Sequence, residues 1–157
     1  MFSPVGKLPI IFTQDYKSEG HRGADLRSYD FEARRFLTIH ATEAMTVTGR
    51  GIDGYGNDFM VCRLEDISCA DTIKYIHCHF DPKIKIGHSL LEGQQIAHST
   101  AIDTDYNPPR GNSTAETGGH HLHLEVWKDD RHLNPADYFE YGNLEFLTKK
   151  MRLEQGV

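Results

Sequence analysis

Short segments rich in β-branched and aromatic residues fill the first 130 residues of the chain, where no helical periodicity is sustained. Clusters of Gly, Asp, Asn and Pro separate these segments, and this succession of strand-forming and turn-forming residues is typical of antiparallel sheets. We therefore expect a mainly β fold with antiparallel sheets. The strands are expected at residues 36–40, 45–48, 59–64, 72–79 and 121–127.

The length of the chain, 157 residues, suffices for one domain with its own hydrophobic core. Near the C-terminus the pattern changes, because Leu144, Leu147 and Met151 have the i, i+3, i+7 spacing of one helical face. We expect a single domain whose core spans about residues 3–139, followed by a C-terminal helix or tail at 140–157.

Charge and hydropathy argue against several classes of protein. The net charge of −6 disfavours a broad nucleic-acid surface, which depends on clustered Lys and Arg. No apolar run approaches the ~18 residues of a membrane span. The first 12 residues lack the apolar stretch of a signal peptide. We therefore expect no nucleic-acid partner, no membrane span and no signal peptide.

The chain has ten histidines, and the densest group follows residues 103–119, a stretch without periodicity that is typical of a functional or a disordered loop. If the segment after it is a strand, His121 and His123 share one face, with Cα atoms roughly 6.6 Å apart. The alternate residues, which include Leu122 and Leu124, then form a buried face. Two imidazoles are therefore expected to face one small site.

A second group supplies a carboxylate, because His21 and Asp25 are four residues apart with Gly23 between them. A glycine permits the backbone dihedrals of a bent segment, which would bring an imidazole and a carboxylate to one ion. Together with His123, these residues form a three-ligand set suited to Zn²⁺ that leaves a fourth position for water.

The general base must be a histidine, because the sequence contains no H-E-x-x-H motif. His121 and His77 are the candidates to hold the attacking water or to stabilise an oxyanion. Strand alternation would place Tyr75, His77 and His79 on one face, and this pattern alone does not choose between His77 and His79.

Four motifs occur in the order found in the M23 (lysostaphin-like, LytM-type) zinc endopeptidases, and the chain resembles that family. Residues 87–96 and Asn134-Pro135 resemble further family segments, so the resemblance covers roughly residues 3–139. The motifs are H-x-G-x-D at 21–25, G-Y-G-N at 54–57, Y-x-H at 75–77 and H-L-H-x-E at 121–125.

The resemblance implies a duplicated hybrid-motif fold. The loop before His121, which is short in the family, is here expanded by residues 103–110, and we expect either a long active-site loop that reshapes one wall of the groove or a disordered surface insertion. It also implies that His21, Asp25 and His123 bind one Zn²⁺ ion and that His77 and His121 are catalytic. The distance from His77 to Gly87 is one residue longer than the family leads us to expect, which keeps His79 as an alternative to His77.

The implied activity is zinc-dependent hydrolysis of peptide bonds in bacterial peptidoglycan. The alternative is a non-catalytic structural or wall-binding module of a phage tail or secretion assembly. A glycosidase using Asp25 and Glu125 is disfavoured because it leaves the histidines unexplained. We expect action on the cell wall, in the periplasm or outside the cell, by a phage-encoded, virion-associated or otherwise exported protein.

Overall fold

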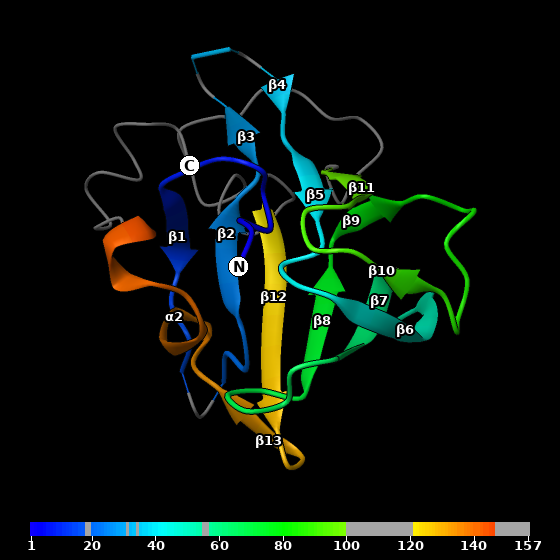
Figure 1. Ribbon diagram of the computed structural model, residues 1–157. Helices are drawn as coiled ribbons and strands as arrows, with labels where there is room; N and C mark the ends of the chain where they lie inside the picture. Colours follow the sequence, from blue (N-terminus) through cyan, green and yellow to red (C-terminus); the bar gives the residue numbers. More distant parts are fainter. Residues whose placement is uncertain (18–19, 31, 34, 55–56, 100–120, 147–157) are drawn as a thin grey trace.

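The computed structural model describes residues 1–146 apart from 18–19, 31, 34, 55–56 and 100–120. The predicted mainly β, antiparallel fold is confirmed (Figure 1). The elements are β1 (Ile10–Gln14), β2 (Ala24–Arg27), β3 (Tyr29–Asp30), β4 (Arg35–Phe36), β5 (Thr38–His40), β6 (Met45–Ile52), β7 (Asp58–Leu64), β8 (Thr72–Ile76), β9 (Cys78–Phe80), β10 (Ser89–Leu90), β11 (Gln95–Ser99), β12 (His121–Lys128), β13 (Arg131–Leu133), α2 (Pro135–Tyr138), the 3₁₀ turn η1 (Tyr141–Asn143) and β14 (Leu144–Phe146).

Among the described residues, nine strands form one large sheet in the order β10-β6-β7-β8-β12-β2-β1-β14, with β13 also paired to β12. Neighbouring strands are antiparallel except β1 and β14. The central position of β12 between β8 and β2 is visible in Figure 1. A small sheet has the order β5-β11-β9, and β3 pairs with β4.

One face of the large sheet forms the hydrophobic core. On β12, Leu122, Leu124 and Val126 are fully buried, as their alternation predicts. Side chains of the small sheet and of α2, such as Ile96 and Tyr138, belong to the same buried cluster. Burying a Leu or Val side chain contributes about 1.5–3 kcal/mol, so β12 is anchored from this face and its other face is available for chemistry.

The strand expected at 72–79 is broken at His77. β8 ends at Ile76, His77 has a φ of 67°, and Cys78 begins β9 in the small sheet. A positive φ in a non-glycine residue interrupts the alternation of side chains. The expectation that Tyr75, His77 and His79 share one face is therefore wrong, because Tyr75 is buried in the core and His79 is exposed on β9.

The helix expected around Leu144 is also wrong in its described part. Leu144–Phe146 is β14, which pairs in parallel with β1, and the rings of Phe12 and Phe146 stack with centroids 4.9 Å apart. The period-2 alternation of Leu144, Glu145 and Phe146 suits this edge better than the longer helical spacing. The rest of the predicted helix, at 147–157, lies outside the described residues.

A short helix does occur near the C-terminal end of the described chain. In α2, the side chain of Asn134 accepts a hydrogen bond from the backbone N–H of Ala136, and Pro135 occupies the first turn. Neither α2 nor any other helix among the described residues has the length and apolar character needed to cross a membrane.

Candidate metal centre

The pairing of β12 with β2 brings the histidine pair next to the carboxylate. His123 is the direct cross-strand partner of Asp25, and His121 is the partner of Arg27. Directly opposed residues on antiparallel strands point to the same face. His121, His123 and Asp25 therefore lie together on the face opposite the core, although nearly one hundred residues separate them in sequence.

The three predicted metal-binding residues converge on one point. His123 Nδ1 lies 2.9 Å and His21 Nε2 lies 3.3 Å from the Oδ1 atom of Asp25. The three donor atoms are within 4.8 Å of one another. A hydrogen bond from His21 Nδ1 to the carbonyl oxygen of Asp15, 2.8 Å long, directs Nε2 towards this cluster.

The electrostatics of the cluster favour a cation. Asp25 is 4% exposed, and its burial opposes ionisation. The hydrogen bonds from His123 and His21 outweigh that effect and lower the pKa of the carboxyl. Burial likewise opposes protonation of His123, but the bonds to Asp25 and Glu125 raise its pKa to about 9. The pKa of His21 is also raised, chiefly by its hydrogen bond to Asp25.

His121 and His77 flank these three residues. The ring centroid of His77 lies 4.9 Å from that of His121 and 6.1 Å from that of His123. His121 Nε2 is 3.7 Å from Asp25 Oδ1. The structure therefore brings His77 to the cluster, whereas His79 is exposed and opposes His98 in the small sheet.

Burial favours the neutral form of both flanking imidazoles. Burial and the neighbouring His121 and His123 lower the pKa of His77 to about 4, and burial lowers the pKa of His121. The Nδ1 atoms of both rings are buried and find no hydrogen-bond partner among the described residues. Buried polar atoms normally have partners, so these nitrogens point to a ligand, a water or a substrate group.

Gly23 fits the site for a different reason from the one that the sequence suggested. Its φ is outside the left-handed region, so unusual dihedrals do not explain it. A Cβ atom there would instead lie 2.5 Å from the carbonyl oxygen of Leu124 and 2.8 Å from Nε2 of His123. The glycine is needed because the backbone passes directly against β12.

Glu125 is a site residue whose role the sequence analysis missed. Its Oε1 atom lies 3.3 Å from His123 Nε2. The side chain is partly buried, which opposes ionisation, but the hydrogen bond from His123 outweighs burial and lowers the pKa of the carboxyl. The alternation of His121, His123 and Glu125 on one strand was the signal that could have indicated it.

The donor set fits Zn²⁺. Two imidazole nitrogens and one carboxylate oxygen are ordinary zinc ligands, and three protein ligands are typical of a catalytic zinc site. The unpartnered nitrogens of His77 and His121 beside this set agree with that assignment. The proposed loop at 103–119 and two residues of the G-Y-G-N motif, Tyr55 and Gly56, lie outside the described residues.

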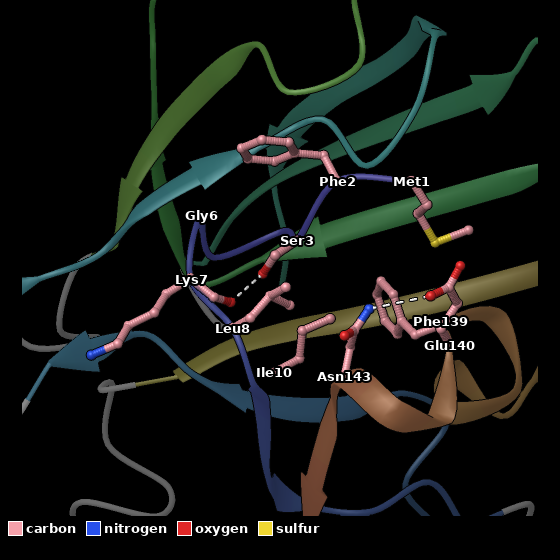
Figure 2. A pocket seen from close by; sticks show the side chains of 10 residues that line it. All are labelled: Met1, Phe2, Ser3, Gly6, Lys7, Leu8, Ile10, Phe139, Glu140 and Asn143. Atoms are coloured by element: carbon pink, nitrogen blue, oxygen red, sulfur yellow. Dashed lines mark hydrogen bonds between the residues drawn. The ribbon is translucent and has the colours of Figure 1, made fainter.

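A separate cavity of about 290 Å³ carries none of these groups (Figure 2). It lies between the N-terminal segment and residues 139–143, beside Ile10, whose side chain belongs to the core. Hydrogen bonds join Ser3 to the carbonyl oxygen of Lys7 and Asn143 to Glu140 along its lining. It shares no residue with the histidine cluster.

Comparison with solved structures finds a similar fold in several bacterial proteins. Csd3 of Helicobacter pylori is 23% identical over 98% of this chain and 37% of its own, with a TM-score of 0.61. A zinc-containing peptidase from Vibrio cholerae is 17% identical over 78% of this chain and 36% of its own, with a TM-score of 0.50. A Pseudomonas aeruginosa protein proposed to be an M23 peptidase is 17% identical over 89% of this chain and 56% of its own, with a TM-score of 0.52.

These likenesses define the class of fold, which is that of M23-type peptidase structures. The chain spans little more than a third of the length of the first two of these proteins. No family model matches the chain. The site therefore has to be interpreted from its own geometry.

Proposed function

We propose that this protein is a zinc-dependent endopeptidase that hydrolyses peptide bonds of bacterial peptidoglycan, in the stem peptide or the cross-bridge. The observation that carries the proposal is the convergence of three donor atoms within 4.8 Å, beside two buried imidazole nitrogens that find no partner among the described residues. The likeness in fold to a zinc-containing peptidase and to a protein proposed to be an M23 peptidase supports the same activity.

His21 Nε2, Asp25 Oδ1 and His123 Nδ1 would hold the ion, because these are the atoms that face one another. When bound, Zn²⁺ supplies a Lewis acid that polarises the scissile carbonyl and lowers the pKa of water. Buried Asp25 contributes a negative charge that is already ionised at neutral pH, since its pKa is lowered. The protein therefore presents an anionic ligand without first removing a proton.

His121 and His77 would carry the proton transfers. A general base has to be unprotonated at the working pH, and the lowered pKa values of both residues satisfy this requirement at pH 7. His121 Nε2 lies 3.7 Å from Asp25 Oδ1, so it is placed to accept a proton from a water at the centre. The ring of His77 lies 4.9 Å from that of His121, and we assign it the hydrogen bond to the developing oxyanion.

The expected site of action is the cell wall, in the periplasm or outside the cell. Peptidoglycan peptides are the proposed partners, and a phage-encoded, virion-associated or otherwise exported protein is the proposed setting, with phage or secretion-assembly components as further partners.

The test is digestion of purified peptidoglycan by the zinc-loaded protein, with mass spectrometry of the released muropeptides. We expect new peptide termini, with loss of both bound zinc and activity in Asp25→Ala and His123→Ala. His121→Ala is expected to keep zinc and lose turnover, because removing a metal ligand releases the ion, whereas removing a general base slows the reaction and leaves the ion bound. Intact muropeptides despite bound zinc, together with wall binding that His121→Ala leaves unchanged, would support a non-catalytic wall-binding module instead.

A further inference from the structure

A second carboxylate lies behind the imidazole of His123. Nδ1 of this ring faces Asp25 Oδ1 at 2.9 Å, whereas Nε2, at the other end, lies 3.3 Å from Glu125 Oε1. The ring is therefore held between two carboxylates, one at the proposed metal and one behind it. Glu125 reaches this place because it is two residues after His123 on β12 and shares its face.

Glu125 is itself held by the hairpin of β12 and β13. Its Oε2 atom accepts a hydrogen bond from Trp127 Nε1 at 3.2 Å and lies 3.6 Å from His132 Nε2. Trp127 and His132 are cross-strand partners, and their ring centroids are 3.6 Å apart. The side chain of Glu125 is 12% exposed, so these contacts restrict it to one orientation.

The two carboxylate oxygens of Glu125 contact different parts of the structure. A carboxylate that only supported the hairpin would need no contact beyond Trp127 and His132, yet Oε1 is directed to a residue of the metal centre. An imidazole that gives its Nδ1 lone pair to a cation must keep its proton on Nε2. A hydrogen-bond acceptor at Nε2 fixes that tautomer and the ring orientation.

We propose that Glu125 is a positioning residue that holds His123 in the Nε2–H tautomer with Nδ1 directed at the metal, and thereby raises the affinity for Zn²⁺. This inference rests on the proposed function only in one respect, because both require that Zn²⁺ binds at this site. It concerns zinc binding and does not require a particular substrate.

The test compares Zn²⁺ affinities, measured by competition with a chromophoric chelator, for the full chain and its variants. Glu125→Ala is expected to weaken Zn²⁺ binding by about 10–100-fold, the range found for residues that orient metal ligands. Glu125→Gln is expected to lose less, because its amide oxygen still accepts the bond from Nε2. The control Glu65→Ala, on the exposed residue that directly follows β7, should keep the affinity of the original chain.

A second measurement separates positioning from structural support. In the zinc-loaded protein, long-range ¹H–¹⁵N correlation spectra should show His123 protonated at Nε2, with faster exchange of that proton in Glu125→Ala. Thermal unfolding without zinc reports damage to the fold itself. Variants that lower the Tm but bind Zn²⁺ with unchanged affinity would show a merely structural role and overturn the proposal.

If Glu125→Ala does not fold, the Zn²⁺ affinities of Glu125→Gln and Trp127→Phe test the proposal instead. Trp127→Phe keeps an aromatic ring against His132 and removes the donor that holds Oε2. We expect a measurable loss of Zn²⁺ affinity in both, and unchanged affinity in both overturns the proposal. A protein that binds zinc but leaves peptidoglycan intact contradicts only the proposed function, and one that takes up no Zn²⁺ contradicts both.

Discussion

Replacing Gly23 by alanine tests whether the close passage of the backbone past β12 is required for the metal centre. The added Cβ would lie 2.5 Å from Leu124 O, 2.8 Å from His123 Nε2 and 3.0 Å from Glu125 Cγ. Ordinary contacts begin at 3.4 Å, so the backbone carbonyl and the added methyl must separate by about 0.9 Å. Leu124 belongs to the central strand of the sheet and cannot move alone.

The added methyl group is expected to displace Asp25 and His123. The chain at Gly23 leads directly into β2, which carries Asp25, and the imidazole of His123 is the nearest side chain. Ligand distances in zinc sites vary by about 0.2 Å, several times less than the required shift. We expect Gly23→Ala to weaken Zn²⁺ binding by about 100-fold and to lower the stability by about 1–3 kcal/mol, the range for overpacking.

The assay is chelator competition for Zn²⁺ together with thermal unfolding, using Gly142→Ala as the matched control. A Cβ at Gly142 would meet no atom within 4 Å, and its φ is not in the left-handed region. The control should therefore keep both properties. A Gly23→Ala protein with a Zn²⁺ affinity within twofold of the original chain and the same Tm would refute the steric argument.

Three further predictions concern protons, the base and the core. The affinity for Zn²⁺ should rise about tenfold per pH unit up to about pH 9, because the raised pKa keeps His123 protonated below that value and a metal must displace the proton. Isothermal titration calorimetry in buffers of different ionisation enthalpy should show at least one proton released per bound ion at pH 7. The acid limb of the pH profile of kcat/KM for peptidoglycan hydrolysis should show no ionisation of His77 near pH 6.5. Its pKa is lowered to about 4, and a nearby cation lowers it further. An acid limb near pH 6.5 that disappears in His77→Ala would contradict this assignment. Leu124→Ala removes a fully buried side chain and should lower the free energy of unfolding in urea by about 3 kcal/mol; a loss below 1 kcal/mol would mean that β12 is not anchored as described.

The local parts of this structure could be predicted from the sequence, and the non-local parts depended on the family resemblance. Alternation along β12 placed His121 and His123 on one face and Leu122 on the other, because the period of a strand is a property of its backbone. That β12 pairs with β2, and so brings His123 to Asp25, follows from the pairing order of the whole sheet. No pattern within either segment specifies that order.

Two predictions failed where tertiary structure overrode a local pattern. The run from Thr72 to His79 has strand composition throughout, but the positive φ at His77 ends one sheet and starts another. Leu144 has the helical spacing with Leu147 and Met151, but the backbone groups at the edge of β1 pair with Leu144–Phe146 as a strand. For Gly23 the sequence predicts freedom of the backbone dihedrals, whereas the structure shows a close contact with β12 that leaves no room for a Cβ.

The left-handed conformation of His77 limits which sequence changes a protein with this fold can accept near the junction of β8 and β9. One residue joins β8 to β9, so its two backbone torsions affect both the direction in which the chain enters the small sheet and the direction of the Cα–Cβ bond that carries the imidazole. A mutation that changes the backbone torsions at this junction would therefore also turn the ring. Divergence that preserves the ring's orientation is expected in segments away from that junction.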